Sequence, residues 1–282
     1  MTGRSLSWID GRWGEANAPE LPLNDRGLLL ADGLFETVLV LDGRARLLEP
    51  HLERWRGSAA LLGLPEPPQA AVVQPLVEEA ITRCDLPNGH GALRLNWSGG
   101  SGGRGLDRPE ALAPRFWLQL SASTPQFSAV RAIVSRHERR NGSSRLSQCK
   151  TFAYGQGIQA RREAHAAGAD DALLLSTSGE LCCGTAANLL VQRQGQWLTP
   201  PLSSGCLPGV MRGQMLNRGL VQEARLEAQP QSGDRWLLIN SLSCRPIASL
   251  DGQDLEPWSD PAGFWRDLLN EFSCSPARRS DR

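Results

Sequence analysis

Two runs of alternating hydrophobic and polar residues, each interrupted by Asp-Gly, lie near the start of the chain. The first is Trp8-Ile9-Asp10-Gly11-Arg12-Trp13, and Asp-Gly favours the two-residue turn that joins antiparallel strands. The second places residues 37–41 and 45–48 on either side of Asp42-Gly43. We therefore expect two β-hairpins in this part of the chain.

Apolar residues then change to helical spacing. A helix is predicted just after Pro50, from apolar residues three or four positions apart: Leu52, Trp55, Ala59 and Leu62. A second helix is predicted over residues 69–83, and its expected apolar face consists of Val72, Leu76, Val77, Ala80 and Ile81. Further helices are predicted at residues 157–167 and from Pro208-Gly209 onward. The other hydrophobic runs predict strands at residues 93–97, 116–120, 129–135, 172–175, 181–183, 189–192, 196–198 and 236–240.

Residues 121–125 are small and polar and end in proline, which is typical of a domain boundary. We expect an N-terminal domain over residues 1–122, a linker at about 121–126 and a C-terminal domain over residues 126–282. Strands and helices are mixed in both halves, and several strands are joined as hairpins. This mixture indicates an α+β fold in each domain.

Composition narrows the class of protein. The 282 residues are 40% hydrophobic and 21% charged, so the chain can bury a core, and disordered and fibrous architectures are excluded. Thirty basic and 30 acidic residues give no net charge, which leaves no bulk attraction to nucleic acid or to an anionic membrane. We recognise no signal peptide after Met1 and no transmembrane run, so we expect a cytoplasmic protein.

Cysteine usage points to a reducing compartment. The seven cysteines are an odd number, Cys182 and Cys183 are adjacent, and no C-x-x-C pair exists in the chain. We therefore expect reduced thiols and no structural metal site, as is usual for a cytosolic chain with this pattern.

The chain contains a single lysine. Of its 30 basic residues 29 are Arg, and only Lys150 is Lys. A primary amine can lose its proton and attack a carbonyl, whereas a guanidinium stays charged at physiological pH. Lys150 is thus a candidate nucleophile, and the alternatives are chance or a packed amine that Arg would overfill. Tyr154, the only tyrosine, lies one turn from Lys150 if a helix begins there, and is otherwise a packing residue.

Two features suit a bound phosphate. The segment Leu207-Pro208-Gly209-Val210-Met211-Arg212 opens a helix, where free backbone N–H groups and the helix dipole attract anions. Arg54 lies off the apolar face of its predicted helix and could clamp the same phosphate with its planar fork. Many helices begin with Pro-Gly without binding a ligand, however, and Arg54, when it is viewed alone, is better explained as a solvated helix arginine.

A glycine-rich run suits a carboxylate. Residues 98–105 read Ser-Gly-Gly-Ser-Gly-Gly-Arg-Gly, which lets the backbone approach a ligand closely and leaves Arg104 free to pair with a carboxylate. Arg94, on the preceding predicted strand, supplies a second cation. The alternative is a connecting loop that binds nothing.

Taken in order, these segments resemble the class IV, fold-type IV enzymes that use pyridoxal 5′-phosphate (PLP). That group contains branched-chain and D-amino-acid aminotransferases and aminodeoxychorismate lyase. The resemblance extends over residues 9–247 and implies a two-domain fold, with a smaller N-terminal and a larger C-terminal domain, and a homodimer. Its motifs are Asp25-Arg26-Gly27, Ala31-Asp32-Gly33-Leu34-Phe35-Glu36-Thr37, Asp42-Gly43, His51-Leu52-Glu53-Arg54, Lys150, Gly168-Ala169-Asp170-Asp171-Ala172-Leu173-Leu174, Ala187-Asn188-Leu189, Leu198-Thr199-Pro200-Pro201 and Leu207-Pro208-Gly209-Val210-Met211-Arg212.

The resemblance also implies roles for individual residues. Lys150 would hold the cofactor as a Schiff base and move a proton at the substrate carbon. The cofactor phosphate would be held by Arg54, the backbone amides of Val210 and Met211, and Ser241. Substrate carboxylates would be received by Arg94 and Arg104.

One departure from the family bears on the activity. The family places a glutamate against the pyridine nitrogen of the cofactor, five residues before the asparagine that matches Asn188, and Cys183 occupies that position here. A thiol with an unperturbed pKa near ~8.5 substitutes poorly for a carboxylate near ~4.3. Glu180 lies three residues earlier, on the opposite face of a regular strand. The weakened electron sink harms transamination more than a reaction that expels enolpyruvate and forms an aromatic ring.

We therefore expect a lyase that converts 4-amino-4-deoxychorismate into 4-aminobenzoate and pyruvate for folate synthesis. The loop at residues 98–105 also resembles the loop of that lyase, although Leu106 stands where the lyase often has Tyr. One alternative is an aminotransferase that acts on D- or branched-chain amino acids. A further alternative, suggested by Cys183, is a PLP-binding protein without turnover.

Overall fold

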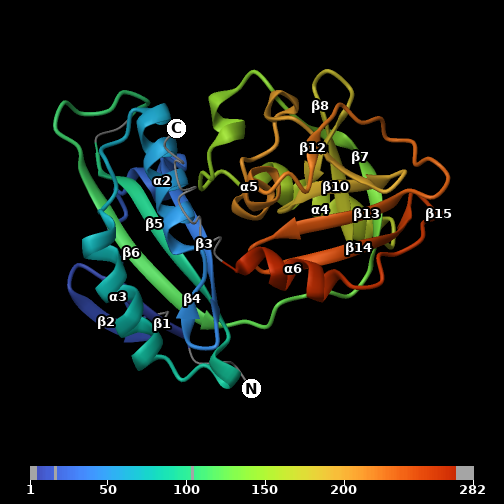
Figure 1. Cartoon of the computed structure of the whole chain (residues 1–282). Helices are drawn as coiled ribbons and strands as arrows, with labels where there is room; N and C mark the ends of the chain where they lie inside the picture. Colours follow the sequence, from blue (N-terminus) through green and yellow to red (C-terminus); the bar gives the residue numbers. More distant parts are fainter. Residues whose placement is uncertain (1–4, 16–17, 103–104, 271–282) are drawn as a thin grey trace, which may run out of the picture.

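The computed structural model describes residues 5–15, 18–102 and 105–270, and these form two sheets that lie side by side (Figure 1). All strands of the first sheet lie before residue 123, and those of the second begin at residue 130. The domain bounds 1–122 and 126–282 stay a prediction. Arg104, one of the predicted substrate ligands, lies outside the described residues.

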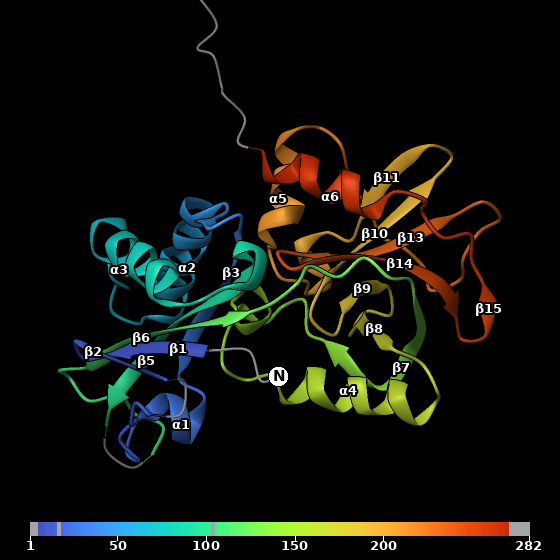
Figure 2. The same ribbon diagram turned by 90° about the horizontal axis from the view of Figure 1, so that it is seen from below.

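The first sheet is antiparallel throughout, with the strand order β2-β1-β6-β5-β3-β4. Its strands are β1 (Ser5–Ile9), β2 (Arg12–Glu15), β3 (Gly33–Leu41), β4 (Arg44–Ala45), β5 (Gly91–Ser101) and β6 (Ala113–Ala122). Its helices are α1 (Arg26–Leu30), α2 (Leu48–Leu62) and α3 (Ala70–Arg83). Helices α2 and α3 lie on one side of the sheet and α1 lies on the other (Figure 2). Trp55, Val77 and Leu118 are buried between α2, α3 and the strands.

The second sheet has the strand order β12-β11-β10-β13-β14-β7-β8-β9, with β15 paired to β14. Cys183 in β9 also pairs with Asn188 in β10, so six strands close into a ring. The strands are β7 (Val130–Arg140), β8 (Asp171–Ser176), β9 (Leu181–Gly184), β10 (Asn188–Arg193), β11 (Gln196–Thr199), β12 (Gln222–Glu223), β13 (Arg235–Asn240), β14 (Ser243–Leu250) and β15 (Gln253–Asp254). The helices are α4 (Gly155–Ala166), α5 (Val210–Asn217) and α6 (Pro261–Leu269).

Both predicted hairpins form, but the second is shorter than expected. Residues 45–48 do not continue as a strand, because Leu47 has a left-handed φ of 52° and α2 already begins at Leu48. Pro50 therefore lies within the first turn of α2, where its missing N–H breaks no helical hydrogen bond. The predicted face of α3 was also wrong at one position: Val73 is fully buried, whereas Val72 is 53% exposed.

Strand β14 and helices α1 and α6 were not predicted. Strand β14 contains Pro246, and proline argues against a strand in the middle of a sheet. Here Pro246 pairs with Leu237 on one side of β14, and the strand meets β7 only further along, from Ile247. Helix α6 carries signals that could have been recognised, because Asp260 caps it and Pro261 occupies its first turn.

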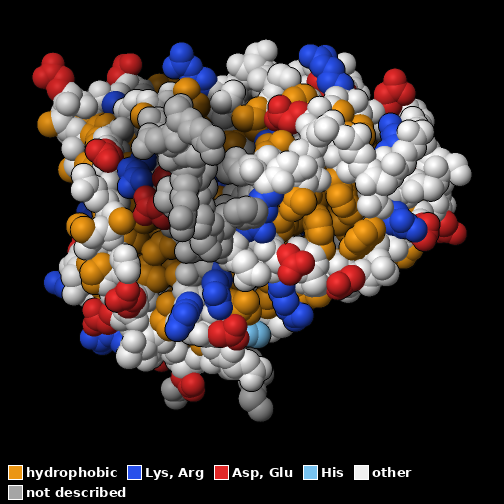
Figure 3. Space-filling view, in the orientation of Figure 1, with side chains coloured by type: hydrophobic (Ala, Val, Ile, Leu, Met, Phe, Trp, Pro, Cys, Tyr) orange, Lys and Arg blue, Asp and Glu red, His pale blue; other side chains and the backbone are white. Residues whose placement is uncertain are grey.

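The surface agrees with the balanced composition. Basic and acidic side chains are interspersed over the face seen in Figure 3, as the zero net charge leads one to expect. Within the described ranges, no helix has both the length and the apolar character needed to cross a bilayer.

Candidate active site

A cavity of about 520 Å³ is lined by residues from both sheets. The first sheet and its helices contribute β3, α2 and β5, and the second sheet and its helices contribute β9, β10 and the start of α5. The cavity contains every predicted site residue that the structure describes: Arg54, Arg94, Lys150, Cys183, Val210, Met211 and Ser241. These residues are distant in sequence, so the fold brings them together.

Lys150 is fixed where the two sheets meet. Its carbonyl oxygen accepts a hydrogen bond from the Phe35 backbone N–H at 2.9 Å, and the Phe152 N–H donates to the Gly33 carbonyl at 3.1 Å. The segment after Lys150 therefore pairs with β3 of the first sheet. Glycine is required at position 33, because a Cβ there would lie 2.3 Å from Cε2 of Phe152.

The Lys150 amine points at two aromatic side chains. Its Nζ donates to the Tyr154 hydroxyl oxygen at 2.8 Å and lies 4.4 Å from the centre of the Phe35 ring. Helix α4 begins only at Gly155, so this contact does not arise from a helical turn that starts at Lys150. Tyr154 is thus more than a packing residue, and the only signal for it was one tyrosine close to one lysine.

The start of α5 forms a cradle suited to an anion. Val210 and Met211 are the first residues of α5, and the cap residue Gly209 offers no side-chain acceptor to their N–H groups. A Cβ on Gly209 would lie 1.9 Å from the Asn188 side-chain oxygen, so only glycine fits. Asn188 in turn donates to the Leu207 carbonyl at 2.9 Å and holds this loop in place.

Arg54 reaches the same cradle from α2. Its Nη1 donates to the Pro208 carbonyl at 3.1 Å, and its Nε donates to Glu36 Oε1 at 2.9 Å. Glu36 also accepts from Arg54 Nη2 and lies 2.7 Å from His51 Nδ1. Arg54 is therefore held by a buried carboxylate behind it, and the reading as a solvated helix arginine was wrong.

The protonation states of this cluster follow from its contacts. Burial raises the pKa of Glu36, but the Arg54 charge and the His51 hydrogen bond outweigh it and lower the pKa to about 2. Burial lowers the pKa of His51, so its ring is neutral and its Nδ1–H donates to the carboxylate. His51 Nε2 is then the acceptor for the Ser241 hydroxyl at 3.1 Å. With that proton engaged, Ser241 can donate to a phosphate only by turning away from His51.

Arg94 lines the cavity from β5. Its Nε donates to Asn96 Oδ1 at 2.7 Å, and its guanidinium carbon lies 3.5 Å from the centre of the Phe35 ring. Burial lowers the pKa of Arg94. Its two terminal nitrogens form no hydrogen bond with any described residue, so they are available to a ligand in the cavity.

The cavity is strongly biased toward positive charge. Among the described residues that line it, four are cations, namely Arg54, Arg94, Arg140 and Lys150, and none is Asp or Glu. Glu36 pairs with Arg54 from behind the wall, whereas Arg94, Arg140 and Lys150 form no ion pair with any described carboxylate, so the cavity is suited to an anionic ligand.

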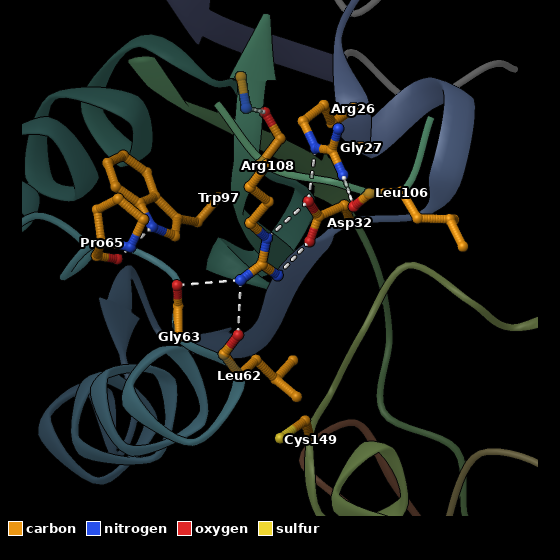
Figure 4. A network of polar contacts seen from close by, with 12 residues as sticks. Arg26, Gly27, Asp32, Leu62, Gly63, Pro65, Trp97, Leu106, Arg108 and Cys149 are labelled. Carbon is orange, nitrogen blue, oxygen red and sulfur yellow. Dashed lines mark hydrogen bonds and ion pairs between the residues drawn. The ribbon is translucent and has the colours of Figure 1, made fainter. Parts of the chain in front are cut away.

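Asp32 from the sequence motif lies outside this cavity and has a structural role. Arg26 Nε donates to it at 2.8 Å and Arg108 Nη2 at 2.6 Å (Figure 4). Burial raises the pKa of Asp32, but the hydrogen bonds from Arg108 and Arg26 lower it below its ordinary value. Arg26 also donates to the carbonyls of Gly105, Leu106 and Asp107, and Arg108 to that of Leu62. The network fastens the end of the glycine-rich loop to α1 and α2.

The closed ring of strands beside an antiparallel sheet, with a lysine cavity lined by both, is the fold-type IV architecture. Residues 33–250 match the family described as amino-transferase class IV. The chain therefore belongs to this family, whose members are PLP-dependent.

Named relatives include both lyases and aminotransferases. A bifunctional aminodeoxychorismate lyase / D-amino acid transaminase of Mycobacterium tuberculosis is 31% identical over 206 residues, which cover 68% of this chain and 70% of the relative. An aminodeoxychorismate lyase of Bacillus subtilis is 24% identical over 264 residues, 87% of each chain. The PLP-bound structure of a hypothetical aminotransferase from M. tuberculosis has a TM-score of 0.78 at 25% identity, covering 94% of this chain and 97% of that one.

The Glu36 cluster yields a pH-dependent prediction. Glu36→Gln leaves Arg54 without its buried counter-charge and is expected to lower the free energy of unfolding at pH 7 by about 3–5 kcal/mol. Because the pKa of Glu36 is lowered from 4.5 to about 2, the wild-type advantage is complete above about pH 5 and shrinks as the pH falls toward 2. Urea unfolding of both proteins between pH 7 and pH 3 measures this difference.

Glu49→Gln is the matched control, since Glu49 lies on α2 but pairs with Arg56 in solvent. It is expected to change stability by less than about 1 kcal/mol at any of these pH values. A difference between wild type and Glu36→Gln that stays constant down to pH 3 would contradict the lowered pKa.

Proposed function

We propose that the protein is a 4-amino-4-deoxychorismate lyase, which releases pyruvate and leaves 4-aminobenzoate. The observation that supports this activity is the charge of the cavity, where four cations face no Asp or Glu among the described lining residues. Glu36 already pairs with Arg54 from behind the wall, and a PLP phosphate and a substrate with two carboxylates together bring more negative charge to the remaining cations than a substrate with one carboxylate does. A monocarboxylate with an apolar side chain would leave part of this charge unpaired.

The residues of the cavity fit PLP. Lys150 offers an amine for the aldehyde, and the free N–H groups of Val210 and Met211, together with Arg54, suit the phosphate. Gly209 leaves room for the Asn188 side chain, which holds the loop before these N–H groups. When bound, PLP supplies an electron sink for the carbon that carries the substrate amine.

Lys150, Tyr154 and two arginines have roles in the proposed reaction. The Lys150 amine moves a proton at the substrate carbon, and the Tyr154 hydroxyl, 2.8 Å away, orients that amine. Arg94 receives one substrate carboxylate through its unused terminal nitrogens and is held flat on Phe35. Arg104 is proposed to receive the other carboxylate.

Cys183 favours lyase over aminotransferase activity. It lines the cavity in place of the family glutamate and is 8% exposed. A neutral thiol stabilises a protonated pyridine nitrogen less than a carboxylate does, and transamination depends on that protonation more than the expulsion of enolpyruvate does. The second candidate function is an aminotransferase for D- or branched-chain amino acids. It is supported by relatives and solved structures whose names include transaminase or aminotransferase.

The activity test compares two reactions of the purified protein. Pyruvate release from aminodeoxychorismate is expected to be faster than transamination of D-alanine or of a branched-chain amino acid. Lys150→Ala and the charge-preserving control Lys150→Arg should both lose at least about 10³-fold of that rate, because neither side chain can bond to the aldehyde. Faster transamination would support the aminotransferase instead. Bound PLP without pyruvate from any amine donor would support a binding protein.

Arg94 gives a separate prediction about substrate binding. Arg94→Gln removes a charged partner of the substrate carboxylate, so KM for aminodeoxychorismate is expected to rise about 10- to 100-fold while the affinity for PLP stays unchanged. Arg94→Lys, which keeps the charge, should recover part of the loss. Steady-state kinetics and a PLP titration measure the two quantities, and an unchanged KM would remove Arg94 from the substrate site.

We also propose a cytoplasmic homodimer. Leu28, Leu29 and Leu30 in α1 are 54%, 60% and 42% exposed, and Leu106, held beside them by Arg26, is 85% exposed. Exposed apolar side chains gathered around one short helix are typical of an interface, and a second copy of the chain is the proposed occupant.

Light scattering is expected to give twice the 30.7 kDa mass of the chain. The exposed substitution Leu29→Asp should shift this mass toward the monomer without unfolding the protein, as circular dichroism would verify. A monomeric wild type at micromolar concentration would exclude the proposed dimer.

A further inference from the structure

The wall of the cavity next to the phosphate cradle contains a thiol and a cation. Cys183 in β9 pairs with Asn188 in β10, and the Asn188 side chain lies directly under Gly209. Arg140, the last residue of β7, lines the same cavity. Its Nε donates to the Gly205 carbonyl at 3.1 Å and its Nη2 to the Ser147 carbonyl at 3.0 Å, so its charge is held in place.

The shape of PLP brings its ring nitrogen to this wall. The nitrogen lies across the ring from the carbon that bonds to Lys150, and it is separated from the phosphate arm by one ring carbon. With the phosphate at Val210 and the aldehyde at Lys150, the nitrogen would point away from the lysine, toward the ring of strands that carries Cys183.

None of the nearby acids belongs to the wall. Asp171 does not line the cavity, and its carboxylate accepts from Arg161, Thr185 and the Ala172 N–H. Glu180 is likewise outside the lining and accepts from Ser178 and Ser204. Within the described part of the chain, the ring nitrogen therefore meets no carboxylate.

We propose that Cys183 and Arg140 keep the ring nitrogen of the bound cofactor unprotonated. The Cys183 S–H donates to the nitrogen lone pair, and the fixed positive charge of Arg140 disfavours uptake of a proton. This inference rests on the proposed attachment of PLP at Lys150. It deepens the proposed function, because a neutral ring withdraws less electron density and suits a reaction in which the substrate expels a leaving group.

The opposite arrangement would be a Cys183 thiolate that accepts from a protonated ring nitrogen. The hydrogen bond from Cys182 and the Arg140 charge do lower the pKa of the Cys183 thiol against the effect of burial. The fixed positive charge of Arg140 would offset the charge of such a thiolate, however, and would disfavour a second positive charge on the nitrogen. The two arrangements predict different affinities for a cofactor without the nitrogen.

The test compares the affinity of the full-length protein for PLP and for 1-deaza-PLP, in which CH replaces the ring nitrogen. Wild type is expected to bind the two within about threefold, since a weak S–H contact is all that is lost. A protonated nitrogen in a charge-assisted hydrogen bond would favour PLP by about 10-fold or more, and that result would overturn the inference.

Two variants at one position sharpen the comparison. Cys183→Ser keeps a neutral donor of similar size and should retain nearly equal affinities. Cys183→Glu places a carboxylate beside Arg140 and should favour PLP over the deaza analogue by about 10-fold or more. The ¹⁵N chemical shift of ring-labelled PLP should fall in the unprotonated range in wild type and Cys183→Ser and move toward the protonated range in Cys183→Glu. A protonated shift in wild type would contradict the proposal without any variant.

Borohydride reduction followed by mass spectrometry separates this inference from the proposed function. An adduct on any residue other than Lys150 would overturn both. An adduct on Lys150 together with a strong preference for PLP over the deaza analogue would overturn the inference alone, and pyruvate release would still decide the activity.

Discussion

The pairing of the Lys150 segment with β3 is the interaction on which the rest of the site depends. Two backbone hydrogen bonds, between Lys150 and Phe35 and between Phe152 and Gly33, join a loop of one sheet to a strand of the other. They place the only lysine beside Phe35, and Phe35 also carries Arg94 on its ring. This pairing, the seam between the two sheets, places residues of both sheets around the Lys150 amine, so that they line a single cavity.

The distribution of charge around the seam follows one principle. Acids that hold arginines lie behind the wall, and the cations themselves face the cavity. Glu36 is buried behind Arg54, and Asp32 holds Arg26 and Arg108 away from the site. Each arginine that needs a fixed orientation receives a carboxylate or carbonyl partner, while the space for the ligand keeps its positive potential. The carboxylates that orient these arginines therefore lie outside the cavity, where they do not contact a ligand.

Local patterns and the family resemblance together named, before the structure, several residues that line this cavity. A lone lysine, a Pro-Gly helix start and an arginine at the right helical face can each be recognised without knowing the fold. What sequence could not give depended on tertiary contacts. The Glu36, His51 and Ser241 contacts join residues up to 190 positions apart, and Tyr154 meets Lys150 through a loop whose path no periodicity describes. Strand β14 escaped prediction because the neighbours of a proline in a sheet are visible only once the sheet is known.

The closure of the strand ring has a consequence for how such proteins diversify. The strand pairing that closes the ring is between Cys183 and Asn188, and it uses main-chain atoms. Any amino acid except proline at position 183 can therefore form the same rung. The Cys183 side chain at the same rung lines the cavity. A substitution at this position can therefore change the chemistry of the cavity wall while the closed ring of strands stays intact.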